Sequence, residues 1–181
     1  MDLQTEILRE HSKRHVEKIA RWIGADKRRF RQLMGLFLHG DYLLAQRSAW
    51  IVNHCAQQYP QLITPWIGAM LDRMQQPGVH VAVPRNTMRI FELIQIPPKH
   101  QGRIVTLCFD YLQSPATPIA IQAYSMGILT KMAAREPDLK NEFRAAVELL
   151  LPHAGPGVRA RARRVFETIA REPHTHQGNS L

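Results

Sequence analysis

Residues 30–55 read FRQLMGLFLHGDYLLAQRSAWIVNHC and contain two helical patterns on either side of a Gly-Asp step. In the first pattern, apolar residues stand at positions i, i+3, i+4, i+7 and i+8, so they share one face of a helix. These residues are Phe30, Leu33, Met34, Phe37 and Leu38. The second pattern has an apolar residue, a small residue four positions later, and apolar residues at +7, +8 and +11. These residues are Leu44, Ser48, Ile51, Val52 and Cys55. The stretch therefore predicts a helical hairpin with two facing apolar stripes.

Both patterns recur along the chain with a spacing of about 37 to 39 residues. Later copies of the first pattern begin at Ile67, Ile104 and Phe143. Later copies of the second begin at Val83, Ile121 and Val158. The second pattern also nearly fits the N-terminal residues Leu8, Ser12, His15, Val16 and Ile19. A single hairpin cannot bury its stripe alone, whereas stacked hairpins can. The sequence therefore predicts an all-α array of about four hairpins and one N-terminal capping helix.

The small residue of the second pattern is Ser, Thr or Ala in every hairpin, which lets the paired helix approach closely. Phe91 occupies a core position of the second hairpin, so we expect its ring to be buried. Residues 79–83, VHVAV, alternate in polarity as a strand does, but Pro84 follows them directly. Because proline is tolerated in the first turn of a helix, this run predicts a helix start.

The period and the two helix patterns resemble the HEAT and HEAT-like repeat family over roughly residues 3–171. That family often carries an Asp and an Arg near the second helix, at the spacing that Asp41 and Arg47 have. The aligned positions of the later hairpins hold His80, Pro118 and Gly155. The resemblance implies an α-α superhelix, a HEAT-like solenoid forming a single domain over residues 1–171. Residues 172–181 are polar and predict a disordered tail.

The chain carries 24 Lys and Arg against 15 Asp and Glu, a formal net charge of +9. Such a balance favours acidic partners, namely nucleic acid, an anionic membrane or an acidic protein, and it also serves solubility. Cations are densest in residues 27–31 and 159–164, each at the start of an expected helix. Because cations there oppose the helix macrodipole, these runs indicate either phosphate contacts or charged ends of the array.

Cys55 and Cys108 stand within the apolar patterns and form no Cys-x-x-Cys pair, which predicts buried, unreactive thiols. The first residues lack the continuous apolar run of a signal peptide. No stretch approaches the roughly 18 apolar residues of a membrane span. We therefore expect a cytoplasmic, reducing setting and no membrane partner.

Helical projection gives the second-pattern helices two columns of residues that point away from the core. One column is Arg14, Trp50, Arg89, Gly127 and Arg164, and its neighbour is His11, Arg47, Asn86, Tyr124 and Arg161. In a HEAT-like solenoid such helices line the concave face. These basic columns therefore predict a surface on which arginines bind phosphates and aromatic rings stack on bases. An alternative stays open, because a third column with Glu17, Glu92 and Glu167 could pair with the arginines and leave a solvated face.

Residues with catalytic or metal-binding chemistry form no motif. His11 and His15 have the i, i+4 spacing of metal ligands, but His15 holds a core position, so we interpret it as a structural histidine. The chain resembles the HEAT-like DNA glycosylases that excise alkylated purines, yet no residue here matches their catalytic Asp. Trp66 stands beside the core residue Ile67 and is interpreted as packing. A nucleophile elbow, a Gly-rich phosphate loop and an HExxH motif are all missing from the sequence.

We therefore expect a non-catalytic repeat scaffold that mediates protein-protein interaction, with no cofactor, metal or small-molecule substrate. The alternative is a nucleic-acid-binding solenoid that uses the basic concave face. In either case the candidate binding residues are Arg14, Arg47, Trp50, Arg89, Tyr124, Arg161 and Arg164.

Overall fold

The computed structural model describes residues 2–171 of the 181-residue chain, so the predicted disordered tail lies outside the described residues. The described part forms ten α-helices and three short 3-10 turns and contains no strand. The helices are α1 (Leu3–Arg9), α2 (Lys13–Ile23), α3 (Lys27–His39), α4 (Tyr42–Gln58), α5 (Ile67–Met74), α6 (Ala82–Leu93), α7 (Pro98–Gln113), α8 (Ile119–Ala133), α9 (Leu139–Leu150) and α10 (Pro156–Arg171). The 3-10 turns are η1 (Pro60–Leu62), η2 (Thr64–Trp66) and η3 (Leu151–His153).

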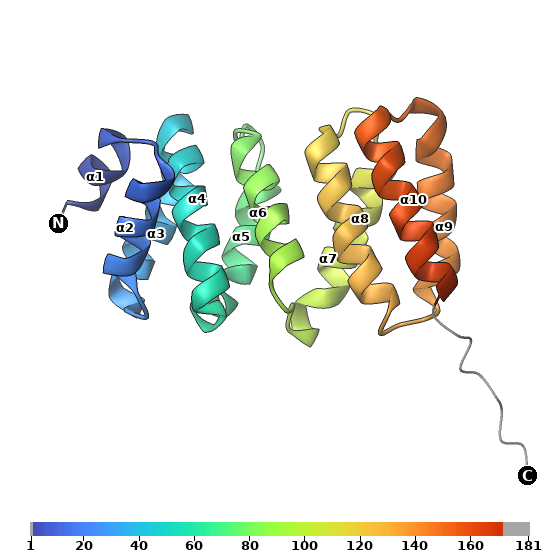
Figure 1. Cartoon of the computed structure of the whole chain (residues 1–181), viewed down its shortest axis with the longest axis horizontal. Coiled ribbons are helices and arrows are strands. Elements are labelled where there is room, and N and C mark those ends of the chain that lie inside the picture. Colours follow the sequence, from blue (N-terminus) through green and yellow to red (C-terminus); the bar gives the residue numbers. More distant parts are fainter. Residues whose placement is uncertain (1, 172–181) are drawn as a thin grey trace, which may run out of the picture. The chain divides into compact units, whose positions relative to one another are not determined.

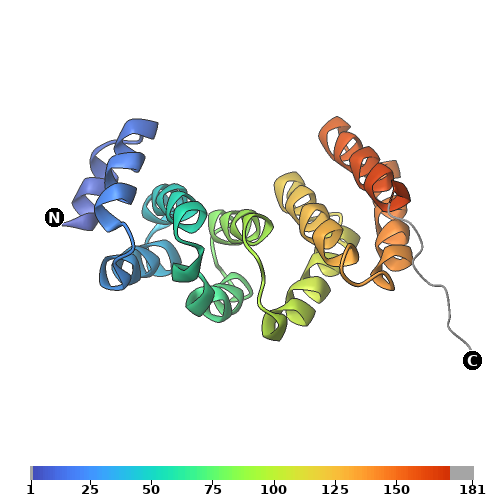
Figure 2. The same cartoon turned by 60° about the horizontal axis from the view of Figure 1, so that its bottom comes forward.

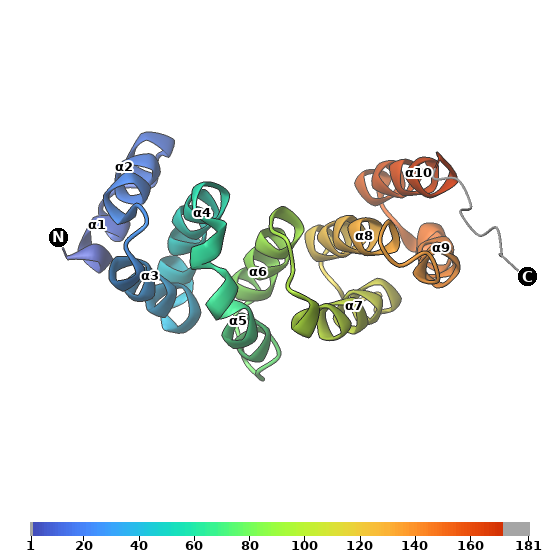
Figure 3. The same ribbon diagram turned by 90° about the horizontal axis from the view of Figure 1, so that it is seen from below.

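The chain divides into two compact units, and the boundary between them falls after Ile104, inside α7. In the first unit, α2, α4 and α6 lie side by side in one row, with α3 and α5 in a second row (Figures 1 and 3). The helices α3 and α4 pack as a hairpin, and α4 also packs against α2 and α6. The long helix α4 is therefore central to the first unit.

In the second unit, α8 and α10 lie side by side, and α9 packs against both of them (Figure 2). Both of these neighbouring helices, α8 and α10, carry the second sequence pattern, so equivalent helices of successive repeats lie next to each other. The prediction of one domain over residues 1–171 stays a prediction.

The core follows the two sequence patterns. All five first-pattern residues of α3 and all five second-pattern residues of α4 are buried. Phe91 is 1% exposed, which confirms the register proposed for the second hairpin. The small position is also buried in each hairpin, at Ser48, Thr87, Ser125 and Ala162. At the C-terminal end the burial weakens, since Phe166 and Ile169 of α10 are only half-buried.

The N-terminal part of the chain differs from its prediction. The pattern predicts one capping helix, but the structure has two, α1 and α2. The chain is extended after α1, and Ser12 then caps α2, because its Oγ accepts a hydrogen bond from the His15 amide at 3.2 Å. The second pattern therefore fits only from His15 onward. The run at residues 79–83 does enter a helix, but α6 begins at Ala82, so Pro84 lies in the first turn as expected.

Candidate binding surfaces

Arg14 of the basic columns lies on α2 at the rim of a pocket of about 390 Å³. The pocket is lined by Arg9, Glu10, Arg14, His15, Lys18 and Arg21. A hydrogen bond from the Ser12 hydroxyl, together with the charges of His15, Arg9 and Arg14, lowers the pKa of Glu10. Glu10 therefore shares this pocket with four permanent cations, of which Arg9 also pairs with Glu6, and the pocket wall formed by α2 is electropositive.

His15 joins α1 to α2 from a position that is 4% exposed. Its Nε2 lies 2.7 Å from the carbonyl oxygen of Glu6, so this nitrogen carries the proton and donates it. The interpretation of His15 as a structural histidine is confirmed by this bond. The other histidine of the pair, His11, contacts the edge of Trp50 with its ring, at 5.0 Å between the ring centroids.

Arg47 fastens α1 onto α4. Its Nη1 donates a hydrogen bond of 2.6 Å to the carbonyl oxygen of Leu8, near the C-terminal end of α1. The last carbonyls of a helix lack partners within it, so a guanidinium there satisfies an orphan acceptor and complements the helix dipole. Asp41, which the family spacing pairs with Arg47, instead caps α4 and accepts from the Leu44 amide at 2.9 Å. Within the basic columns, Arg47 is therefore committed to the fold.

The remaining column residues differ in how open they are. In the first unit, Arg89 of α6 is exposed, while Asn86 is 9% exposed and donates to the carbonyl oxygen of Ala82 in its own helix. In the second unit, Arg164 of α10 is exposed, and Arg161 and Tyr124 are half-buried. Glu17, expected beside Arg14, has its carboxylate 3.9 Å from the ammonium of Lys13. Arg14, Arg89 and Arg164 are thus the column residues best placed to meet a ligand.

The thiols and hydroxyls of the repeat patterns are buried in the core. Cys55 and Cys108 are free thiols and are buried, as predicted. Burial raises the pKa of each thiol from the usual 9.0 to about 12, so neither ionises near neutral pH. The Ser125 hydroxyl donates to the Ile121 carbonyl within α8. Across residues 2–171, the structure gathers no group of three His, Cys, Asp or Glu side chains suited to a metal ion.

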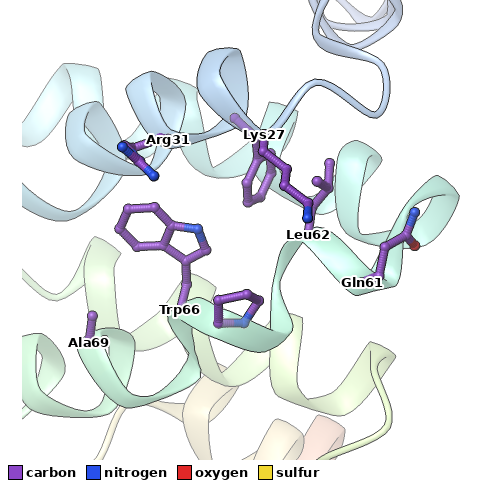
Figure 4. Close-up of a pocket in the computed structure, with 8 residues that line it drawn as sticks. Lys27, Arg31, Gln61, Leu62, Trp66 and Ala69 are labelled. Atoms are coloured by element: carbon purple, nitrogen blue, oxygen red, sulfur yellow. The ribbon is translucent and has the colours of Figure 1, made fainter.

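Trp66 opens onto a second pocket, of about 400 Å³, which the sequence patterns do not indicate. Phe30 and Leu62 are buried beneath it, whereas Lys27 and Arg31 are exposed at its edge. Figure 4 shows Arg31 reaching down from α3 over the indole, which rises from η2, while Lys27 extends from α3 toward Leu62. The packing role predicted for Trp66 is therefore incomplete, because its half-buried ring also lines a pocket.

A comparison with known protein families matches residues 3–169 to the family described as HEAT repeat domain. The chain belongs to the HEAT repeat family. No curated protein and no solved structure matches it. The match covers the helices of both compact units, in agreement with the two recurring helix patterns.

Each hairpin of this HEAT repeat chain also exposes the residue that stands two positions before the first residue of its second pattern. These residues are Tyr42, Val81, Ile119 and Pro156. Tyr42, Val81 and Ile119 are 49%, 43% and 63% exposed. Two positions along a helix correspond to about 200°, so these side chains point away from the core that the next apolar residue enters.

In the first unit, a ring contact joins two neighbouring hairpins at these apolar positions. The ring of His80 tilts against Tyr42, with 4.1 Å between the ring centroids. His80 is held there because its Nδ1 accepts a hydrogen bond from the Ala82 amide at the start of α6. Tyr42, Leu43, His80 and Val81 thus form an exposed apolar patch at the N-terminal ends of α4 and α6.

Within the described residues, no helix is long and apolar enough to cross a membrane.

Proposed function

We propose that this HEAT repeat chain is a non-catalytic scaffold that binds a partner protein at the N-terminal ends of its second-pattern helices. The observation that carries the proposal is the exposed patch of Tyr42, Leu43, His80 and Val81. Protein interfaces are enriched in aromatic side chains and have an apolar centre. Tyr42 supplies a large ring at low entropic cost, and the contact with His80 already orders it.

The fold supports this proposal because it separates stability from recognition. The buried face of each second-pattern helix holds the array together, while the position two residues earlier is free to vary without disturbing the core. Repeat scaffolds commonly use such a set of equivalent positions to hold an extended partner. The family is generally one of non-catalytic scaffolds, which agrees with thiols whose pKa is raised to about 12.

The proposal is tested by comparing what the wild-type chain and a patch variant retain from an extract. The variant Tyr42→Ser with Val81→Ser removes two exposed apolar side chains and leaves the core untouched. Leu149→Ser is the matched control, because Leu149 is 75% exposed on α9 and lies outside the patch. We expect proteins that are retained by the wild type and by the control, but lost by the patch variant. Retention of the same proteins by all three chains would rule the patch out.

The basic columns remain a predicted second surface. Arg14 is their best-placed member, since Lys18 and Arg21 line the same pocket one and two turns further along α2. Arg47→Ala is not a suitable test of phosphate binding at this surface, contrary to what the sequence pattern indicates, because it also removes the bond to Leu8.

A further inference from the structure

We propose that the pocket between α3 and η2 binds one nucleotide of a single-stranded nucleic acid, with the base on the Trp66 indole and the phosphate between Lys27 and Arg31. This inference goes beyond the proposed protein-binding function and uses a different part of the first unit. It is carried by the pocket itself, by the charge at its edge and by the state of its tryptophan.

The three tryptophans of the chain have different surroundings. Arg29 covers the indole of Trp22, with its guanidinium carbon 4.4 Å from the ring centroid. His11 contacts the ring of Trp50 at 5.0 Å between centroids. Trp66 instead lines the pocket, and its half-buried ring forms part of the wall. The indole of Trp66 therefore has room for a flat ring beside it, and a base stacks on such a surface whatever its sequence.

The cations at the pocket are unexplained by the fold. Lys27 is the first residue of α3, where its charge opposes the helix dipole. Asp26 already caps this end, accepting from the amides of Arg28 and Arg29 at 2.8 and 3.0 Å. Arg31 follows Lys27 by one turn, so both side chains leave the same face of α3 and flank the indole (Figure 4). The helix dipole repels the charge of Lys27, whereas the phosphate of a ligand would attract the charges of both Lys27 and Arg31.

The chemistry of the lining selects a nucleotide over an acidic peptide. The eight described residues that line the pocket include two cations and no carboxylate, so the complementary group is an anion. Carboxylates of a peptide would satisfy the cations alone, whereas a nucleotide also uses the indole and the ring of Pro65. Gln61 is exposed at the same edge and can donate to or accept from a base edge. A volume of about 400 Å³ is within the usual range for a small-ligand site.

The test is the binding of a labelled single-stranded oligothymidylate of about 12 nucleotides, a length within the usual site size for such proteins. Fluorescence anisotropy of the full chain is measured between about 50 and 200 mM salt. Trp66→Ala should weaken binding about tenfold with an unchanged salt slope, because it removes stacking and no charge. Lys27→Ala with Arg31→Ala should lower the magnitude of the slope of log K against log salt by about 0.7, the value for the one phosphate that the two cations hold on a single strand.

Two further variants separate the site from loss of folding or of general charge. Ala69→Glu places a carboxylate at an exposed position of the pocket wall and should weaken binding, while Ala116→Glu adds the same charge in the other unit and should not. Arg28→Ala with Lys99→Ala removes two exposed charges of the first unit outside the pocket. This control should bind within about threefold of the wild type if the two lost charges make no phosphate contact.

Trp66→Phe should keep most of the affinity because it retains an aromatic face. The proposal is overturned if the oligonucleotide does not bind, or if Trp66→Ala binds as tightly as the wild type. It is equally overturned if the Lys27 and Arg31 double variant keeps the wild-type salt slope. Competition by a polyglutamate peptide as effective as by unlabelled oligothymidylate would show a charge surface that takes any polyanion, and would also exclude the proposed site.

Discussion

At the scale of single residues, the two cysteines show what burial does to chemistry. Cys55 is 1% exposed and Cys108 is fully buried, and desolvation raises the pKa of both thiols to about 12. In the unfolded chain the thiols ionise near their usual pKa of 9.0. The folded state therefore favours the protonated thiol. Its contribution to stability is complete below pH 9.0 and is lost as the pH rises toward 12.

We predict that neither thiol reacts with a thiol-specific reagent in the native protein, at pH 8 or at pH 10. The rate should follow global unfolding rather than thiolate formation, because the pKa of about 12 leaves little thiolate at either pH. In denaturant both thiols should react at once, and faster at the higher pH. A fast native-state reaction whose rate rises about tenfold in total between pH 8 and pH 10, as it does for a thiol that titrates at its usual pKa of 9.0, would show an accessible thiol and contradict this prediction.

At the scale of elements, two glycines of the first hairpin have opposite roles. Gly35 lies in the middle of α3, and a Cβ built there meets no atom within 4 Å. Gly40 lies in the turn between α3 and α4, where a Cβ would be 2.4 Å from the carbonyl oxygen of Leu36 and 3.0 Å from the Leu44 side chain. The turn that starts α4 therefore requires glycine at position 40, and α3 does not require it at position 35.

We predict that Gly35→Ala raises the free energy of unfolding by about 1 kcal/mol, because alanine is the better helix former and nothing obstructs it. Gly40→Ala should lower it by about 1 to 3 kcal/mol, because backbone must move away from the new methyl group. Urea unfolding of the two variants measures both effects against the wild type. Equal shifts in the same direction would mean that the α3–α4 turn has another conformation.

Element boundaries also mark what the sequence could and could not predict. The spacing of Phe30 to Leu38 predicts a buried stripe, because one helix face is fixed by its period. The break between α1 and α2 interrupts that period where Ser12 caps α2, and a contact with a distant helix also holds α1, since Arg47 of α4 donates to the Leu8 carbonyl. The Trp66 pocket depends on η1 and η2, two short turns around prolines that follow no helical period. The available signal for the pocket in the sequence was Trp66, which follows a Thr-Pro step. Because Trp66 precedes α5, it does not belong to the apolar face of that helix.

At the scale of the whole molecule, stability is spread over local interfaces. In a repeat array each helix pair contributes its own packing and that of its nearest neighbours. Within the first unit α4 packs on α2, α3 and α6, and within the second α8 packs on α9 and α10. The same sequence patterns build both units. This is why periodicity predicts the array but not how many cooperative units it forms.

We predict that Phe91→Ala and Phe143→Ala, one in each unit, have local effects. Both rings are almost fully buried, at 1% and 0% exposure, so each truncation should cost about 3 to 5 kcal/mol where it occurs. Hydrogen exchange should show lost protection in α4 and α6 for Phe91→Ala, and in α8 and α9 for Phe143→Ala, with the other unit close to wild type. A uniform loss of protection from either substitution would instead establish one cooperative domain over residues 1–171. The resemblance predicts that single domain, whereas the chain divides into its two compact units inside α7. Each substitution changes packing in one unit only. The region that loses protection from hydrogen exchange therefore distinguishes two cooperative units from one cooperative domain.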